Sequence, residues 1–234
     1  MHFLPYGYIM KKTAKRRITK VKSNETEGKV ILLNGSPHKN GTTARALKEI
    51  ASTLEAQGLE AVVIHACATG HRGCTACGFC KGGGGCVFDD GVNEIAEALA
   101  DADGLVLASP VYYASPNGDF LALLDRLFYS SSRKMKHMMV GASVVAARRG
   151  GCTASFDALN KYFTISGMPI ASSSYWNQIH GSSAEDAEGD LEGLHTMRTL
   201  GKNMAFLIKS IRLGKEKLGL PELEPKIYTN FIKR

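Results

Sequence analysis

Short continuous apolar runs alternate along the chain with longer stretches whose apolar residues fall on one helical face. The run VILLN at 30–34 ends at a glycine and is typical of a strand buried on both sides. The stretch 42–57 has helical periodicity, and a second apolar run follows at 61–66. The helical stripe occupies positions i, i+3, i+4 and i+7, namely Leu47, Ile50, Ala51 and Leu54. Strand, helix and strand in this order predict a parallel sheet.

The same alternation continues through the rest of the chain. Further strands are predicted at 104–109, at 138–147 and, as a short edge strand, at 168–172. Further helices are predicted at about 92–99, 120–130, 153–165 and 186–212. The pattern therefore predicts an α/β fold with one doubly wound, five-stranded parallel sheet and helices on both faces.

We expect this domain to span 29–213, between an N-terminal tail (1–28) and a C-terminal arm (214–234). The net charge of +7 comes from the tail, because residues 1–24 hold seven basic groups and no acidic one. Such a tail is expected to be a flexible, solvated arm, and nucleic acid is an unlikely partner. No apolar run is long enough to span a membrane, and the first residues lack the charge order of a signal peptide. A cytoplasmic protein with reduced thiols is therefore expected.

In a doubly wound sheet, ligands bind at the carboxyl ends of strands, so the loops after the first, third and fourth predicted strands should carry chemistry. The first loop, GSPHKNGTT at 35–43, offers hydroxyls and free backbone N–H groups at a helix N-terminus, which suits a phosphate. Its spacing matches neither a Walker loop nor G-x-G-x-x-G. A plain strand-to-helix turn with a threonine cap stays open as the alternative.

The other two loops suit a planar ring. SPVYYASPNGDF at 109–120 is stiffened by two prolines and places Tyr112 and Tyr113 among polar residues, although simple packing of these rings is the alternative. AARRGG at 146–151 combines glycines that admit a close approach with arginines that suit a phosphate or a polar ring edge. A phosphate site and a planar-ring site on neighbouring loops together indicate flavin mononucleotide (FMN).

Four of the six cysteines lie in CTACGFCKGGGGC at 74–86, with the spacing C-x2-C-x2-C-x5-C. The first spacings match loops that wrap an iron–sulfur cluster, and the glycine run lets a fourth ligand come from the same loop. A disulfide conflicts with a reducing compartment, and zinc more often takes two well-separated C-x2-C pairs. A cluster is the favoured interpretation, while zinc and cysteines without a bound group stay open.

Other titratable residues give weaker signals. Cys67 and Cys152 have no partner spacing and are expected to be buried. Asp90, with its neighbour Asp89, is expected to cap the following helix. The adjacent Asp125 and Arg126 are expected in a surface or inter-helix ion pair. No metal-like pairing is found among His65, His71, His137, His180 and His195. No residue is assigned a catalytic acid–base role, because cofactors would supply the chemistry.

Four segments together resemble the NADPH-dependent FMN reductase superfamily, and more narrowly its iron-sulfur flavoprotein branch. They are LNGSPHKNGTT, the loop CTACGFC with its later cysteine and aspartates, ASPVYYASPNGDFLALLDR and the RRGG turn. The resemblance covers about residues 29–210 and implies a flavodoxin-like fold. One departure is His38, where many members of the family carry arginine, and this weakens the expectation of a charged contact there.

The resemblance also implies site residues. The FMN phosphate is expected on Ser36, His38, Asn40, Gly41, Thr42 and Thr43. The isoalloxazine ring is expected against Pro110, Val111, Tyr112 and Tyr113, near the turn of Arg149, Gly150 and Gly151. A [4Fe-4S] cluster is expected on Cys74, Cys77, Cys80 and Cys86.

The sequence thus predicts an FMN-dependent oxidoreductase that passes electrons between a [4Fe-4S] cluster and FMN. Its redox partner would be a ferredoxin or a small electrophile, and no motif assigns an NAD(P)H site. The resemblance implies a homo-oligomer, a dimer or a tetramer. The main alternative is an NAD(P)H-dependent FMN reductase that acts on quinone, azo or nitro compounds without a cluster. A flavodoxin-fold module whose basic tail binds nucleic acid is a third, much weaker interpretation.

Overall fold

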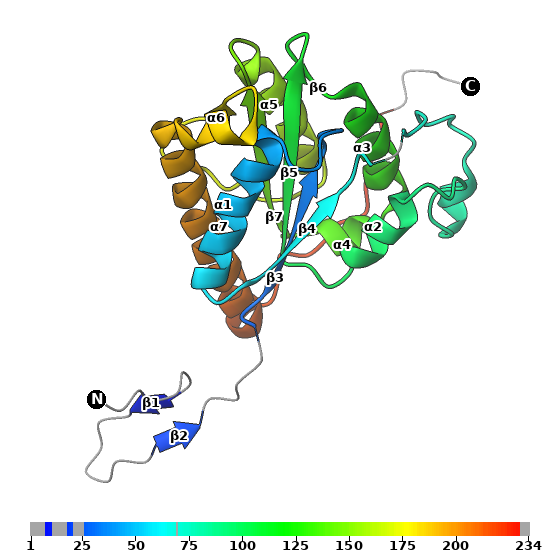
Figure 1. The fold of residues 1–234 in the computed structure, drawn as a ribbon. Helices are drawn as coiled ribbons and strands as arrows, with labels where there is room; N and C mark the ends of the chain where they lie inside the picture. The colour runs from blue at the N-terminus through cyan, green and yellow to red at the C-terminus, as the bar shows by residue number, and fades with distance from the viewer. Residues whose placement is uncertain (1–7, 11–17, 21–25, 69, 230–234) are drawn as a thin grey trace.

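The centre of the molecule is a parallel sheet with the strand order β4–β3–β5–β7–β8 (Figure 1). The computed structural model describes residues 8–10, 18–20, 26–68 and 70–229. A further strand, β6, pairs with β5 in the antiparallel direction. The strands are β3 (Lys29–Asn34), β4 (Glu60–His65), β5 (Gly104–Tyr112), β6 (Ser115–Pro116), β7 (Val140–Ala147) and β8 (Gln178–His180). The chain passes from β3 to β4 on one side and then returns to β5 on the other, which makes a switch point between β3 and β5.

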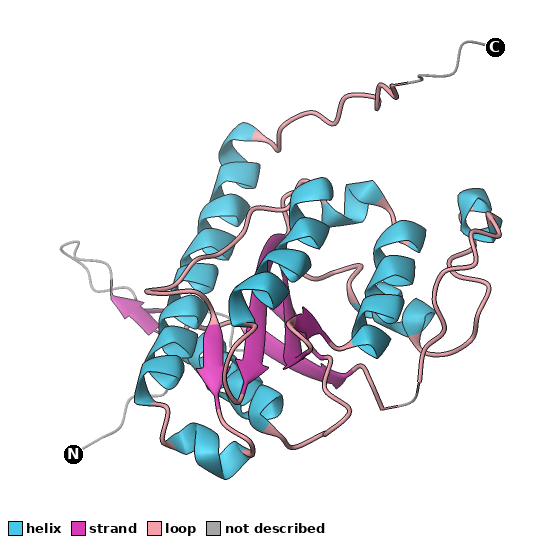
Figure 2. Ribbon diagram, turned by 90° about the horizontal axis from the view of Figure 1, so that it is seen from above, coloured by secondary structure: helices cyan, strands magenta, loops and turns pink. Residues whose placement is uncertain are grey.

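Helices cover both faces of the sheet (Figure 2). One face carries α1 (Thr42–Ala56), α6 (Ala184–Glu188) and α7 (Leu191–Leu218). The other carries α2 (Val92–Ala98), α3 (Gly118–Ser130) and α5 (Cys152–Ile165), and the short helices η1 (Phe79–Gly82) and α4 (Arg133–Lys136) complete the set. Val30 and Leu32 of β3 pack into the first core, whereas Ile31 and Leu33 pack into the second. A strand covered on both sides has no polar face, which explains its continuous apolar run.

The predicted doubly wound α/β architecture is confirmed, but the fifth parallel strand was placed wrongly. In the predicted segment 168–172, only Ile170 forms a bridge, to Gly141 of β7. The edge strand is β8 (Gln178–His180), which pairs with the carboxyl end of β7. The Asn177 side chain supports the pairing of β8 with β7, because it donates to the Ser143 carbonyl at 3.0 Å. Three residues with one buried apolar side chain carry too little pattern to be recognised as a strand.

The predicted helix at 186–212 is two helices in the structure. The chain breaks at Gly189, and Asp190 caps α7 by accepting a hydrogen bond from the Gly193 N–H at 2.9 Å. Helix α7 then continues to Leu218, so the first residues of the expected arm (214–234) are helical. Beyond it, the Pro221 carbonyl lies 2.8 Å from a ring nitrogen of His137.

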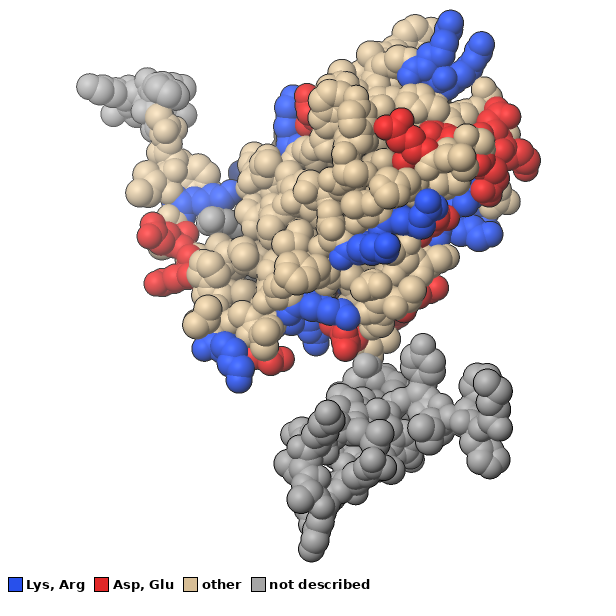
Figure 3. Space-filling view, turned by 90° about the vertical axis from the view of Figure 1, so that its left-hand side faces the viewer, with Lys and Arg blue, Asp and Glu red and all other residues tan. Residues whose placement is uncertain are grey.

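Two short strands lie in the N-terminal segment 1–28, and the rest of the expected tail up to residue 25 lies outside the described residues. Strands β1 (Tyr8–Met10) and β2 (Ile18–Lys20) pair antiparallel. On the side of the molecule turned to the viewer in Figure 3, basic and acidic side chains are interspersed, and residues 29–213 carry no net charge. Within the described residues, no helix combines the length and apolarity that a bilayer crossing needs.

Candidate functional site

The three predicted ligand loops meet at one edge of the sheet, because β3, β5 and β7 are neighbours and end at the same side (Figure 1). The turn after β7 also packs on the loop after β5. Gly151 has φ 98°, and a Cβ built on it would lie 2.8 Å from Val111 Cγ1 and 2.9 Å from Ala114 Cα. Only glycine combines this conformation with so close an approach. The sequence prediction of one composite edge is thus matched by direct contact between two of the loops.

The loop after β3 is held by its own polar groups. The Asn34 side chain accepts a hydrogen bond from the Ser36 N–H at 3.0 Å and donates to the Lys39 carbonyl at 3.3 Å. The buried Ser36 hydroxyl accepts from the His38 N–H at 3.1 Å. Helix α1 begins directly afterwards at Thr42, and its N-cap residue, Gly41, supplies no side-chain cap. The first-turn N–H groups of α1 have no partner within the helix, so this end suits an anion.

The predicted phosphate ligands differ in their exposure and in their hydrogen-bond partners. His38 and Asn40 are exposed, whereas Thr43 is buried. The Thr42 hydroxyl donates to the carbonyls of Gly181 and Ser183, at 3.2 and 3.0 Å, so it ties α1 to the chain after β8. Backbone N–H groups and the Ser36 hydroxyl are therefore the donors best placed for a phosphate at this helix end.

The segment after β5 is a tight hairpin rather than an irregular loop. Strand β5 runs through Pro110 and Val111 to Tyr112, and β6 pairs back onto it. The two turn residues, Tyr113 and Ala114, have positive φ angles of 50° and 57°, as a two-residue type I′ connection requires. Tyr112 and Tyr113 are exposed, and Tyr113 is fully so. The exposed aromatic rings and the exposed pair Arg149–Gly150 therefore flank one edge, where a planar ligand would be reached from solvent.

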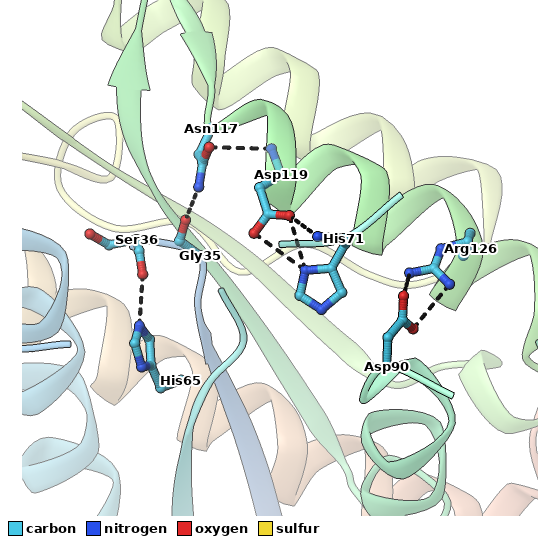
Figure 4. Close-up of polar contacts among 8 residues, drawn as sticks. All are labelled: Gly35, Ser36, His65, His71, Asp90, Asn117, Asp119 and Arg126. Carbon is cyan, nitrogen blue, oxygen red and sulfur yellow. Dashed lines mark hydrogen bonds and ion pairs between the residues drawn. The ribbon is translucent and has the colours of Figure 1, made fainter. Parts of the chain in front are cut away.

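Two supporting residues of this edge were missed at the sequence level. The Asn117 amide donates to the Gly35 carbonyl at 2.9 Å, and its oxygen accepts from the Asp119 N–H as the cap of α3 (Figure 4). A ring nitrogen of His65 lies 2.9 Å from the Ser36 carbonyl. The Asn-Gly-Asp sequence before an apolar helix is a recognisable cap signal, but its contact with Gly35 depends on the fold.

The cysteine loop lies beside α3, at the right in Figure 1. Cys74 and Cys77 are exposed, Cys80 and Cys86 are partly buried, and no disulfide joins any of the six cysteines. Cys86 is the best anchored of the four. Its backbone N–H donates to the Asn93 side chain at 2.8 Å, and its carbonyl accepts from the same side chain at 2.9 Å. The loop is therefore firmly attached near one of its four thiols.

The cap predicted for Asp90 was wrong, and the ion pair expected for Arg126 forms inside the molecule, between α3 and the segment before α2. Arg126 is not at the surface and does not pair with Asp125, which instead accepts from the Tyr162 hydroxyl at 2.6 Å. Its guanidinium donates twice to Asp90, at 3.0 and 2.6 Å (Figure 4). Its Nη1 also lies 3.5 Å from Cys86 Sγ. Asp90 thus pairs with a buried cation, and the cap of α2 is Gly91, with φ 92°.

The loop and α3 enclose a small hollow whose lining suits an anionic, sulfur-rich group. Its wall combines the four cysteines with three residues of α3, Arg126, Tyr129 and Ser130. Among the described residues, Arg126 Nε and Ser130 Oγ are buried polar atoms without a hydrogen-bond partner. Unmet buried donors are rare in proteins and indicate an acceptor at this position. The donor set therefore fits an iron–sulfur cluster, and the hollow, of about 20 Å³, requires the glycine-rich loop to open for it.

The positions of the four loop thiols can be compared with those of a closed zinc site. Four thiolates at 2.3 Å from one zinc ion would be about 3.8 Å apart. Among the described residues, no three of the four loop thiols lie within 4.8 Å of one another. The four thiols of this loop are therefore not arranged as a closed tetrahedral zinc site.

A third group, Cys67, His71 and Asp119, was also missed. One ligand-type atom of each lies within 4.8 Å of the others. Asp119 accepts hydrogen bonds from the His71 backbone N–H and contacts its Nδ1 at 3.1 Å (Figure 4). Burial and the Asp119 carboxylate raise the pKa of the Cys67 thiol, so it stays neutral. As predicted, Cys67 and Cys152 are buried. The group fastens the start of the cysteine loop to α3.

Fold and site together define a class, an α/β protein of flavodoxin-like topology whose switch point carries a loop and a helix N-terminus that suit an anion. Solved structures agree with this fold. RosB, solved with a bound intermediate, is 13% identical, has a TM-score of 0.64 and aligns over 88% of this chain and 94% of its own. A flavodoxin from the domain Archaea is 14% identical, has a TM-score of 0.54 and aligns over 77% of this chain and 99% of its own.

The chain belongs to the NADPH-dependent FMN reductase family, whose model matches residues 28–181, and to its iron-sulfur flavoprotein branch. An iron-sulfur flavoprotein of Methanocaldococcus jannaschii is 30% identical over 196 residues, which is 79% of this chain and 99% of that protein. An iron-sulfur flavoprotein of Methanosarcina thermophila is 26% identical over 192 residues, or 81% and 100% of the two chains. The protein is accordingly a flavin-dependent oxidoreductase.

Proposed function

We propose that the chain binds FMN at the carboxyl ends of β3, β5 and β7, where the loops 35–43, 109–120 and 146–151 meet; we call this region the strand-end edge. We propose further that the loop 74–86 holds a [4Fe-4S] cluster and that electrons pass between the two groups. The observation that carries this proposal is helix α3, which contacts both regions. Asn117 at its start donates to the Gly35 carbonyl, and Arg126, about two turns later, lies against Cys86. One helix thus contacts both regions, and this supports the proposal that electrons pass between them.

At the strand-end edge, the chain's residues would bind and orient the flavin. The N-terminus of α1 and the Ser36 hydroxyl would hold its phosphate, because both offer hydrogen-bond donors and the helix end carries partial positive charge. The hairpin residues 110–113 and the turn 149–151 would border the ring system. The positive φ angles of Tyr113 and Ala114 fix the direction of this hairpin tip.

In the cysteine loop, the thiolates of Cys74, Cys77, Cys80 and Cys86 would hold the cluster. When bound, FMN can exchange one or two electrons and an iron–sulfur cluster exchanges single electrons. Free thiols at all six cysteines suit the reducing compartment expected for such a protein, the cytoplasm.

The proposal includes partners. A ferredoxin or a small electrophile would exchange electrons with the exposed edge beside Tyr112 and Tyr113, and NAD(P)H would serve as an alternative donor. We also propose a homo-oligomer, dimer or tetramer, because α7 exposes the apolar side chains of Phe206 and Leu213 seven positions apart, on one helical face. Sedimentation of the purified protein as a monomer would contradict the oligomer.

The experiment that tests the function is anaerobic purification with iron, sulfide and FMN assayed per chain. About four irons, four sulfides and one FMN are expected. FMN without iron or sulfide, even after anaerobic reconstitution, would contradict the cluster.

That second outcome would favour an NAD(P)H-dependent FMN reductase that acts on quinone, azo or nitro compounds. The small volume of the cysteine hollow favours this candidate, since about 20 Å³ holds no more than a water molecule. Rapid flavin reduction by NADPH in iron-free protein would distinguish it from the first candidate.

A further inference from the structure

Arg126 is a buried cation beside the cysteine loop, with only 2% of its surface exposed. A charge this deeply buried is costly unless it is paired. Asp90 provides the pairing through both guanidinium Nη atoms, at 3.0 and 2.6 Å. The Phe88 ring covers the guanidinium, with 5.4 Å between Arg126 Cζ and the ring centroid. These contacts fix the position of the guanidinium but use only part of its five N–H donors.

One guanidinium nitrogen contacts a sulfur atom, and another has no partner. Arg126 Nη1 lies 3.5 Å from Cys86 Sγ, and Nε has no partner among the described residues. One turn later on the same face of α3, Ser130 adds a second unpartnered polar atom, its buried hydroxyl, to the wall of the cysteine hollow. The wall of the cysteine hollow therefore holds one N–H···S contact and one unpartnered hydroxyl, and Arg126 Nε adds a further buried donor without a partner.

A group bound there would be anionic, because its ligands are thiolates. The reduction potential of an iron–sulfur cluster depends on its net charge, on hydrogen bonds to its sulfurs and on solvent exposure. A nearby cation and N–H donors stabilise the more negative, reduced state more than the oxidised one.

We infer that Arg126, fixed by Asp90 and assisted by Ser130, raises the reduction potential of the group held by the four cysteines. This inference rests on the proposed cluster. In the step concerned, one electron enters the cluster from FMN or from an external one-electron donor, and the cluster charge becomes one unit more negative. No bond is made or broken and no proton moves. Arg126 is a positioning residue in this account, since it acts on the thiolates and their bound group electrostatically.

The test is a potentiometric titration of the anaerobic, reconstituted protein, followed by electron paramagnetic resonance of the reduced cluster. Arg126→Met should shift the one-electron equilibrium toward the oxidised state by about tenfold or more, which is about 59 mV of lower potential. Ser130→Ala should lower the potential by less, and Arg126→Lys should fall between wild type and Arg126→Met. Asp90→Asn should shift it in the opposite direction, because it removes a negative charge and leaves the cation.

The opposite signs separate this role from a merely structural one, since local disorder would move both variants alike. Arg198→Met serves as the control, because Arg198 pairs with Glu49 on α1, on the far face of the sheet. Iron and sulfide per chain are measured in every sample. Wild type without iron would overturn the proposed function and this inference with it.

Iron in wild type, with equal potentials in Arg126→Met and Asp90→Asn, would overturn the inference and leave the function standing. If Arg126→Met takes up no iron, Asp90→Asn and Ser130→Ala decide. Unchanged potentials in both would overturn the inference, whereas a rise in the first and a fall in the second would support it.

Discussion

The strand-end edge and the cysteine loop are built on different principles. The edge is formed by adjacent parallel strands whose pairing fixes its loops, as the register from Asn34↔Ala108 to Pro110↔Ala146 shows. The cysteine loop has no pairing to a strand and is fastened at a few points. His71 is held by Asp119 near its start, and Cys86 by Asn93 at its end. The sheet thus preforms the first site, whereas a bound group would have to organise the second.

The largest effect that this contrast predicts is the separate loss of the cluster. Cys77→Ser should reduce iron from about four per chain to below about one while FMN remains bound, because the loop contributes nothing to the sheet edge. Iron and FMN assays after anaerobic reconstitution measure this, with Cys152→Ala as the control outside the loop. Loss of both groups in Cys77→Ser would mean that the two regions are structurally interdependent.

A substitution at Gly35 should instead damage the strand-end edge, because it disturbs the packing there. A Cβ at Gly35 would lie 2.3 Å from the Phe120 ring, so Gly35→Ala should lower the free energy of unfolding by about 1–3 kcal/mol and weaken FMN binding. Urea unfolding and fluorimetric FMN titration measure the two effects. At Gly214 in α7 an added Cβ meets nothing within 4 Å, so Gly214→Ala should be neutral or slightly stabilising. Equal behaviour of the two variants would contradict the packing argument.

A smaller effect is expected at the residue that joins the two regions. Asn117→Ala removes both the helix cap and the hydrogen bond to Gly35, so we expect a loss of about 1–2 kcal/mol in stability. Asn117→Asp keeps an oxygen for the cap but loses the donor to the Gly35 carbonyl. FMN binding should therefore weaken in both variants, while thermal unfolding should be affected mainly in Asn117→Ala. An FMN affinity in Asn117→Asp equal to that of wild type would contradict a role of this hydrogen bond in FMN binding.

The smallest effect on stability is expected at Glu49, in the middle of α1. Burial alone would raise the pKa of Glu49, but hydrogen bonds from Arg198 and Arg45 outweigh it and hold this pKa below its usual range. A lowered folded-state pKa gives stability that is present above the unfolded pKa of about 4.3 and is lost as the pH falls through the folded one.

Glu49→Gln should therefore cost about 1 kcal/mol at neutral pH, a modest value because these pairs are partly exposed. The difference from wild type should shrink toward pH 3, as Glu49 becomes protonated first in the unfolded state and then in the folded state. Urea unfolding at the two pH values measures this change. A constant difference would mean that the side chain acts through packing instead of charge.

The strand-end edge was largely predictable, because buried parallel strands are recognised by their continuous apolar runs. The topology of such a sheet then determines which loops meet. The hairpin at Tyr112 and Tyr113 and the edge strand β8 were not, since each depends on a few residues with little pattern. The spacing of the four cysteines identified the loop. The partnership of Arg126 with Asp90 and Cys86 needed the three-dimensional structure, because 36 and 40 positions separate the partners in sequence.

The central claim, electron transfer between the cluster and FMN, is tested most directly by anaerobic rapid mixing of the loaded protein with a reduced ferredoxin. The visible absorbance of the flavin is followed in wild type and in Cys77→Ser. We predict that flavin reduction follows cluster reduction in wild type and is slowed at least about tenfold in the variant, as losses at metal-site residues commonly cause. Equal rates of flavin reduction in the two proteins would contradict the account.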